Sequence, residues 1–306
     1  MSARISITLD DLILLKADAR GFSFLPKQPV SSLLAGRHAS RLRGRGLIFE
    51  ELRHYHQGDD VRTIDWKATA RLRSTHVRVY NEERERPVLF VVDQRFPMFF
   101  GSRRAMKSVV AAELAALGAW AVLHSGDRVG GIVFNESEVV EVRPHRSQTR
   151  VLNLFHAIVQ QNQLLASDEP ASGHTTLNDA LRNALHVANH DHLVILLSDL
   201  DGADAETQRL ATLIAARNDM LVVAIYDPLG ASLVGSPGMI ASDRGQSWEI
   251  PARDSFTHKF RQSFQDRLDQ WQQIFRNLKI PVMPISTSVP PVGQIRAIFG
   301  HQPSAK

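Results

Sequence analysis

Three short apolar runs along the chain predict the central strands of its fold. They are residues 88–92 (VLFVV), 193–197 (LVILL) and 221–225 (LVVAI). Each run has the length of a strand, and none alternates between polar and apolar residues as a strand with one solvated face does. This pattern is typical of parallel strands that helices cover on both faces.

An aspartate follows each run within two residues. These acids are Asp93, Asp199 and Asp227. The ligand crevice of an open α/β sheet lies at the carboxyl ends of its strands, so carboxylates at these positions indicate a site. The same positions also suit aspartates that cap the next helix or stabilise a turn. Both interpretations stay open at the level of the sequence.

Helical patterns separate the apolar runs. We expect helices at residues 103–124, 150–164, 178–189 and 205–217, and two further strands at residues 128–135 and 138–143. The alternation of strands and helices predicts an α/β fold with a doubly wound, mostly parallel sheet in three layers.

The C-terminal third begins with residues 235–250, which are rich in Gly, Ser and Pro and predict a loop or a short hairpin. A long helix is expected at residues 254–278, and a last strand at residues 282–286. The long helix carries apolar side chains at spacings of three and four, a stripe that indicates packing on the core. The stripe consists of Phe256, Phe260, Phe264, Leu268, Trp271 and Phe275.

The N-terminal part has a different pattern. Thr8 followed by Asp11 resembles a capping box that opens a helix. Residues 36–46 are rich in Gly and Arg and predict a loop, whereas residues 49–56 and 77–83 have the composition of strands. The prolines at 290 and 291 suggest a frayed C-terminus. We therefore expect an N-terminal subdomain at 1–86, an α/β domain at 87–288 and a tail at 289–306.

Composition excludes several kinds of site. The chain has 306 residues, 43% hydrophobic and 22% charged, which is usual for a soluble globular protein. It has no cysteine, which excludes disulfides, thiolate metal sites and cysteine nucleophiles. The apolar stretch at residues 12–15 is too short for a signal peptide, and the most apolar helical window, residues 109–123, is interrupted by Glu113. We expect no membrane span and a cytoplasmic location.

Positive charge is concentrated near the N-terminus. Residues 36–86 contain twelve basic and eight acidic residues, a net charge of +4 that equals the net charge of the whole chain. Such a block can bind nucleic acid or an acidic partner. Because the acids are interleaved with the bases, an internal network of ion pairs is the favoured interpretation, and nucleic-acid binding is the less favoured one.

A dense signature of glycines, charges and aromatic residues occupies this block. It comprises Gly44, Gly46, Phe49, Arg53, Tyr55, Gly58, Asp59, Asp60, Arg62, Ile64, Asp65, Trp66, Ala70 and Arg71. With these residues in this order, the chain resembles the bacterial family named domain of unknown function 58, over about residues 30–290. The resemblance implies a von Willebrand factor A-like domain and a role as adaptor or co-chaperone for a MoxR-type AAA+ ATPase. That functional part is an association and not a mechanism.

The signature also has a physical interpretation. Gly58 permits a turn in which the following aspartates bond nearby amides. We expect Asp60 and Asp65 to form a charge-assisted network with Arg62 and Arg71, anchored by a buried Trp66. The alternative is a metal-dependent hydrolase that uses Asp59, Asp60 and Asp65, although the neighbouring arginines would compete for those carboxylates.

The resemblance implies a metal site at the strand ends, built from an Asp-x-Ser-x-Ser loop, a threonine and a second aspartate. Asp93, Thr175 and Asp199 match this pattern, whereas Arg95 and Pro97 stand at the two serine positions. Neither replacement supplies a side-chain oxygen, so the sequence predicts a degenerate metal-ion-dependent adhesion site.

Arg95 suggests how the charge is balanced without a metal. We expect its guanidinium to pair with Asp93 or Asp199, since arginine readily forks onto carboxylates. In the alternative, Arg95 points to solvent and Asp93, Thr175 and Asp199 bind Mg²⁺ weakly. We expect no cofactor, no catalytic residue and a non-enzymatic, protein-binding function.

Overall fold

The computed structural model describes residues 3–19, 47–82, 86–166, 173–229, 240–243, 246–249 and 277–299, with single positions between 258 and 275. By its contacts the chain divides into a large unit, residues 1–37 and 86–306, and a small unit, residues 38–85.

The large unit is built on a six-stranded sheet with the strand order β10-β7-β6-β3-β4-β5. Every neighbouring pair is parallel except β4 and β5, which are antiparallel. The prediction of a mixed α/β fold with a mostly parallel central sheet is confirmed. The strands are β3 (Val88–Asp93), β4 (Val129–Phe134), β5 (Val139–His145), β6 (Leu193–Ser198), β7 (Asp219–Tyr226) and β10 (Val282–Ser286).

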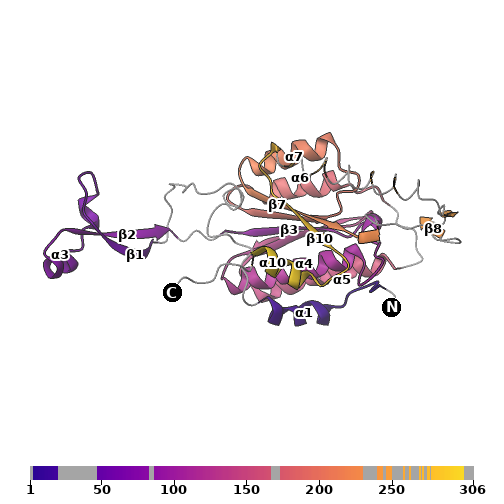
Figure 1. Ribbon diagram of the computed structural model, residues 1–306, viewed down its shortest axis with the longest axis horizontal. Coiled ribbons are helices and arrows are strands. Elements are labelled where there is room, and N and C mark those ends of the chain that lie inside the picture. The colour runs from indigo at the N-terminus through magenta and orange to yellow at the C-terminus, as the bar shows by residue number, and fades with distance from the viewer. Residues whose placement is uncertain are drawn as a thin grey trace. The chain divides into compact units, whose positions relative to one another are not determined.

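Helices lie on both faces of this sheet (Figure 1). One face carries α1 (Leu9–Asp18), α4 (Lys107–His124), α5 (Gln148–Leu164) and α10 (Pro291–Phe299). The other face carries α6 (Leu177–Val187) and α7 (Ala205–Ala215). The helices predicted between the strands therefore form close to the expected residues.

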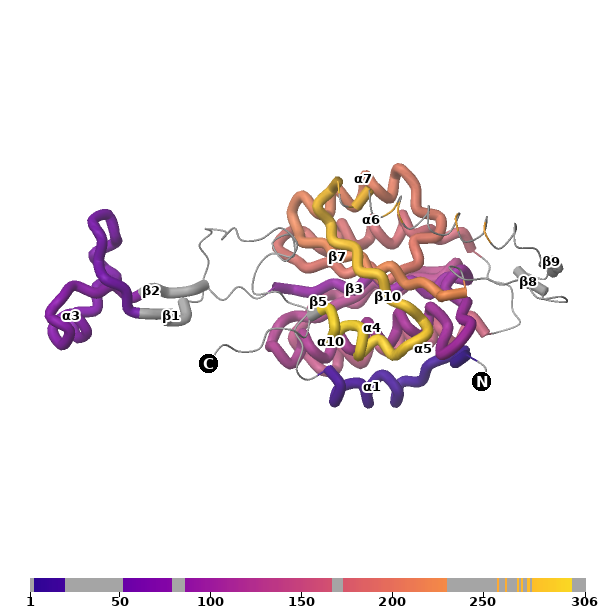
Figure 2. Tube along the Cα trace, in the orientation of Figure 1, coloured from indigo at the N-terminus to yellow at the C-terminus, as the bar shows by residue number. Residues whose placement is uncertain are grey.

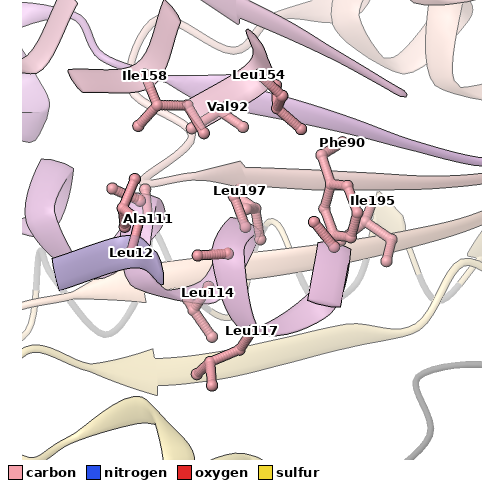
Figure 3. Packing of buried hydrophobic residues seen from close by; sticks show 14 of the residues in the cluster. Leu12, Phe90, Val92, Ala111, Leu114, Leu117, Leu154, Ile158, Ile195 and Leu197 are labelled. Carbon is pink, nitrogen blue, oxygen red and sulfur yellow. The ribbon is translucent and has the colours of Figure 1, made fainter. Parts of the chain in front are cut away.

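The central strand β3 shows why its sequence is apolar throughout. Its side chains alternate between two hydrophobic clusters: Phe90 and Val92 pack with the helices of the α4 face, and Leu89 and Val91 with those of the α6 face. Figure 3 shows the first cluster, in which Phe90 and Val92 lie near side chains of α4 and α5. All six residues of β3 are buried, as expected for a strand covered on both faces.

Helix α4 is apolar around its whole circumference. Among the described residues it is the one helix with the length and hydropathy of a membrane span, and 83% of that window is buried inside the large unit. A helix that is apolar all round is expected in the centre of a packed domain, so its burial accounts for its composition.

The first helix belongs to the large unit, which differs from the predicted subdomain at residues 1–86. The predicted capping box is present, since Thr8 and Asp11 bond each other's backbone amides. Leu12 is fully buried in the α4 cluster, and the Trp120 indole N–H donates to the Leu12 carbonyl at 2.9 Å. The apolar face of α1 therefore packs on α4, within the large unit (Figure 2).

Within the predicted tail at residues 289–306, residues 291–299 form a helix, α10. Pro291 is the first residue of α10, a position where a helix tolerates proline because its N–H would have no helical partner. Ile295 is fully buried, and the Arg296 guanidinium donates to the Asp18 carbonyl of α1 at 3.3 Å. The prolines therefore start a helix here instead of ending regular structure.

Two further predictions fall on partly described segments. Within residues 235–250, β8 (Ile240–Asp243) and β9 (Gln246–Glu249) form an antiparallel pair, the short hairpin that composition allowed. In the predicted helix 254–278, Trp271 and Phe275 are buried in the α6 cluster. The remaining members of the aromatic stripe and the predicted loop at residues 36–46 lie outside the described residues.

The small unit is a strand pair with a short helical connection. Strands β1 (Leu47–His54) and β2 (His76–Glu82) are antiparallel, and η1 (Val61–Thr63) and α3 (Trp66–Leu72) lie between them in the chain. Among residues 52–78, whose side chains the structure describes, Ala68, His76 and Val77 are the buried ones. This unit therefore contains very little core in its described part.

Candidate functional site

Arg95 lies on Asp93 at the carboxyl end of β3. Its Nε and Nη2 donate to the two oxygens of the Asp93 carboxylate at 3.0 and 2.7 Å, and its backbone N–H donates to the same group at 3.1 Å. The Asp93 side chain is completely buried, and the Arg95 side chain is 9% exposed. The alternative in which Arg95 points to solvent therefore does not hold.

Two more groups complete the surroundings of this ion pair. The Ser198 hydroxyl, at the end of β6, donates to Asp93 at 2.6 Å, and Arg95 Nη2 also donates to the Asp201 carbonyl at 3.1 Å. Burial disfavours the charged guanidinium, but the negative charges of Asp93, Asp199 and Asp201 outweigh it and raise the pKa of Arg95 above its ordinary value. The pair is charged on both sides and closed by hydrogen bonds.

Asp199, the second predicted acid, has its own cation. Lys107 Nζ, on the first residue of α4, forms an ion pair with the Asp199 carboxylate, and both side chains are mostly buried. The other Asp199 oxygen accepts the Asp201 backbone N–H at 3.0 Å. Asp199 is thus engaged by α4 and by its own loop, and not by Arg95.

Asp227, the third strand-end acid, has neutral donors. It accepts hydrogen bonds from the Ser102 backbone N–H at 2.8 Å, and from the Ser102 and Thr287 hydroxyls at 2.5 Å each. The Leu229 N–H donates to it at 2.9 Å. Burial raises the pKa of this carboxyl, but the four donors together lower it below its ordinary value. Asp227 ties together the loops that follow β3, β7 and β10.

Thr175 and Pro97 lie in loops fixed by Glu136. The Thr175 N–H donates to the Glu136 carbonyl at 3.0 Å, and the Glu136 carboxylate accepts the Phe96 N–H at 2.5 Å. A Cβ at Gly173 would lie 2.1 Å from that carbonyl, so the loop passes too close for any side chain. Pro97 lies inside the short helix η2 (Phe96–Met98), where it offers no ligand.

The residues at this edge of the sheet do not fit a metal ion. A divalent cation at Asp93 would have to displace a guanidinium that already neutralises the carboxylate through two hydrogen bonds. Among the described residues, no group of three or more His, Cys, Asp or Glu side chains is arranged to hold a metal. The arrangement is a buried, charge-balanced cluster.

The signature aspartates of the small unit are engaged locally. Asp59 accepts the Arg53 guanidinium and the His56 N–H, both at 2.8 Å, and these bonds lower its pKa. Asp60 accepts the Arg62 backbone N–H at 2.9 Å as the N-cap of η1. Gly58 has a φ of 107°, which confirms the predicted turn.

Asp65 caps α3 and forms an ion pair outside the predicted network. It accepts the Ala68 N–H at 3.0 Å and the Arg78 Nε at 2.8 Å, and the Arg78 bond is the main cause of its lowered pKa. The prediction that Arg62 and Arg71 pair with Asp60 and Asp65 is therefore wrong. Asp65 pairs with Arg78 instead, and Asp60 accepts a backbone N–H.

The prediction of a buried Trp66 is also wrong, because this side chain is 69% exposed. Ala68, and not Trp66, faces the interior of the small unit. Phe49 pairs with Tyr80 across the two strands, and the Tyr55 N–H donates to the Thr75 carbonyl at 2.9 Å. Gly44 and Gly46 lie outside the described residues.

Sequence reasoning missed Lys107 and Ser198 as partners of the strand-end acids. A signal for Lys107 was its place at the start of the apolar helix that follows β3, since such a helix begins at the carboxyl edge of the sheet. Ser198 directly precedes Asp199 and ends a buried strand, so a polar atom there required a buried partner.

Comparisons with known proteins give a family. The model of the family described as "Protein of unknown function DUF58" matches residues 51–273. Uncharacterized proteins of Mycobacterium bovis and Mycobacterium tuberculosis are each 27% identical over 229 residues, which cover 75% of this chain and 70% of the relative.

Solved structures are more distant. The conserved hypothetical protein BatB from Bacteroides thetaiotaomicron is 14% identical, with a TM-score of 0.44, over 70% of this chain and 95% of that one. A von Willebrand factor type A protein from Catenulispora acidiphila is 14% identical, with a TM-score of 0.31, over 62% and 43% of the two chains. The family match, in contrast, spans most of the sequence, and the chain belongs to the DUF58 family of proteins of unknown function.

Proposed function

We propose that this protein is a non-enzymatic adaptor in the cytoplasm that binds a partner protein, a MoxR-type AAA+ ATPase. Its large unit is a doubly wound, three-layer domain of the von Willebrand factor A type. In this domain an internal ion pair replaces the metal of the adhesion site. The assignment of the partner rests on the family resemblance. The metal-free site rests on the chemistry at the strand ends.

The Arg95–Asp93 pair is the observation that carries the proposal. Asp93 holds the position of the first metal ligand and is fully buried, with both oxygens bonded to the guanidinium. A buried carboxylate requires fixed donors, and a bidentate arginine supplies both hydrogen bonds and the positive charge that a metal would supply. The face can therefore stay folded and present its loops without a bridging ion.

The paired acids also weaken the case for hydrolysis. Lys107 neutralises Asp199, and the carboxylates of Asp59 and Asp65 accept arginines. A general base or a metal-activated water needs a carboxylate that is open to the substrate. These groups instead cap helices and form ion pairs, which is consistent with a binding function.

Two measurements test the proposal. Thermal melting of the wild type should show no shift on addition of millimolar Mg²⁺, because a ligand raises the melting temperature only if it binds the folded state. The Arg95→Ser, Pro97→Ser variant restores both serines and is the positive control for a detectable shift. A wild-type shift that disappears in Asp199→Ala would contradict the internal ion pair.

The second measurement concerns the partner. Purified chain and the purified MoxR-type ATPase of the same host are expected to form a complex whose affinity is unchanged when EDTA is added to the chain beforehand. Arg143→Ala, a substitution of an 80% exposed side chain, is the matched control for surface changes. Absence of a complex would overturn the assigned partner, and an affinity that requires Mg²⁺ bound to the chain would overturn the metal-free mode.

A further inference from the structure

The connection between β1 and β2 exposes large apolar side chains that the small unit does not use. Trp66 is 69% exposed, Val61 61% and Leu72 48%. Tryptophan is among the side chains that folded proteins bury most completely on average, so one this exposed needs an explanation. We call the exposed residues of this segment the η1–α3 surface; they are Val61, Arg62, Trp66, Lys67, Ala70, Arg71, Leu72 and Arg73.

The helical geometry of α3 directs Trp66 outward. Ala68 is buried at 4% exposure, and Trp66 begins the helix half a turn before it, on the opposite side. Ala70 follows Trp66 at a spacing of four and shares its side of the helix. Asp65 caps this helix, so the direction in which Trp66 points is fixed by a local hydrogen bond.

The η1–α3 surface is also strongly basic. Arg62, Lys67, Arg71 and Arg73 are exposed, and no ion pair to them occurs among the described residues. Of the nearby described acids, Asp59 is paired with Arg53 and Asp65 with Arg78, and Asp60 caps η1. Within residues 52–78, four cations therefore accompany the exposed tryptophan with no ion pair to them.

Folding of the small unit does not account for these side chains. Two strands with a short helix are marginally stable unless they pack on something else. Among residues 52–78 the buried side chains are small or polar, namely Ala68, His76 and Val77. Val61, Trp66 and Leu72 thus lie largely outside the core of the described part of the unit.

We propose that the η1–α3 surface docks an acidic partner protein that has an apolar pocket for Trp66. This inference rests on the proposed adaptor function and specifies where the partner binds. Tryptophan and arginine are the residues that most often dominate binding energy at protein interfaces, and the four exposed cations favour negative charge opposite them. The aliphatic side chains of Val61 and Leu72 match a protein surface better than a nucleic-acid backbone, which offers them no apolar contact.

Photocrosslinking in the native host tests the location and the occupant. The photoreactive amino acid p-benzoylphenylalanine replaces Trp66 in the full chain, and a second variant carries it at Leu14, a 73% exposed residue of α1. We expect a discrete adduct from position 66 that is absent from position 14. Mass spectrometry of the adduct should identify a protein with crosslinked peptides in an acidic segment.

Binding to the purified, identified protein then tests the chemistry. Trp66→Ala should weaken the affinity by about 30-fold or more, as expected for a central interface residue. Lys67→Glu with Arg71→Glu should weaken it by at least about tenfold through like-charge repulsion. Arg143→Glu with Arg150→Glu has the same change of charge on exposed residues of the large unit and should leave the affinity unchanged.

Several results would overturn the inference. If position 66 gives no more adduct than the Leu14 control, the surface is not occupied. The occupant is wrong if the adduct contains a second copy of the chain, a nucleic acid or a lipid. Unchanged circular dichroism of the variants excludes a loss of folding as the cause. If the ATPase binds equally well to all variants, the adaptor function stands and this surface fails. If another acidic protein binds here, the surface stands and the ATPase assignment fails.

Discussion

The two units of this protein use apolar side chains in opposite ways. In the large unit, Phe90 and its neighbours on β3 are buried to within 1% exposure between two layers of helices. In the small unit, Trp66 is 69% exposed and the described core consists of Ala68, His76 and Val77. One unit gains stability from its apolar residues, whereas the other leaves them available for contact.

Charges show the same difference. Asp93 and Asp227 in the large unit are buried and held by fixed donors. In the small unit the two ion pairs among the described residues are only partly buried, as in Arg78–Asp65, where the arginine is 45% exposed. Buried pairs are expensive to break and exposed ones are worth little, so substitutions should separate the two units clearly.

The largest expected effect is at the strand-end ion pair. Arg95→Ala leaves the buried carboxylate of Asp93 without its cation, which should cost about 4 kcal/mol of unfolding free energy. Urea denaturation of the purified chain measures this loss. Arg143→Ala, at an 80% exposed side chain, is the matched control and should change stability by less than about 0.5 kcal/mol. Equal effects at both arginines would contradict the buried pair.

The next effect tests whether the first helix belongs to the large unit. Leu12 is fully buried against α4, so Leu12→Ala should cost about 3 kcal/mol in the same denaturation experiment. Leu14→Ala on the same helix replaces a 73% exposed side chain and should have almost no effect. If both substitutions were neutral, α1 would not contribute to the core.

The central strands and their helices were predictable because burial on both faces leaves a direct mark on sequence. The runs beginning at Val88, Leu193 and Leu221 all fall in strands, and the capping box at Thr8 marks the start of α1. What a helix packs against was not predictable. Leu12 belongs to the large unit through contacts with residues about a hundred positions away, and no local pattern encodes them.

The strand-end site was predictable in part. The substitution of a serine position by Arg95 indicated an internal cation, because arginine and carboxylate are complementary in shape and charge. Arg95 pairs with Asp93 and not with Asp199 because Lys107, on α4, forms the ion pair with Asp199. The burial of Trp66 was mispredicted because tryptophan is usually buried, and its exposure reflects the orientation of a seven-residue helix.

A smaller, pH-dependent effect is expected at Asp227. Its pKa is lowered in the folded state, so its contribution to stability is full above the ordinary value of 3.8 and is lost as the pH falls through the lower folded-state value. Asp227→Asn cannot accept all four hydrogen bonds and should cost about 2 kcal/mol at neutral pH. Urea denaturation of both proteins across the acid range should show this difference shrinking below about pH 4. Asp191→Asn, at a 64% exposed side chain, serves as control, and a difference that persists at low pH would contradict the assigned role.

The smallest expected effect is the one that most sharply separates the two units. Trp66→Ala should change the hydrogen-exchange protection of the β1 and β2 amides by less than about 0.5 kcal/mol, because the side chain is 69% exposed. Trp120→Ala replaces a 3% exposed tryptophan in the large unit and should cost about 4 kcal/mol. Clear loss of β1–β2 protection in Trp66→Ala would show that the side chain supports folding. If protection is kept while partner binding is lost, the position of this tryptophan is explained by recognition, since the small unit then gains no stability from placing it there.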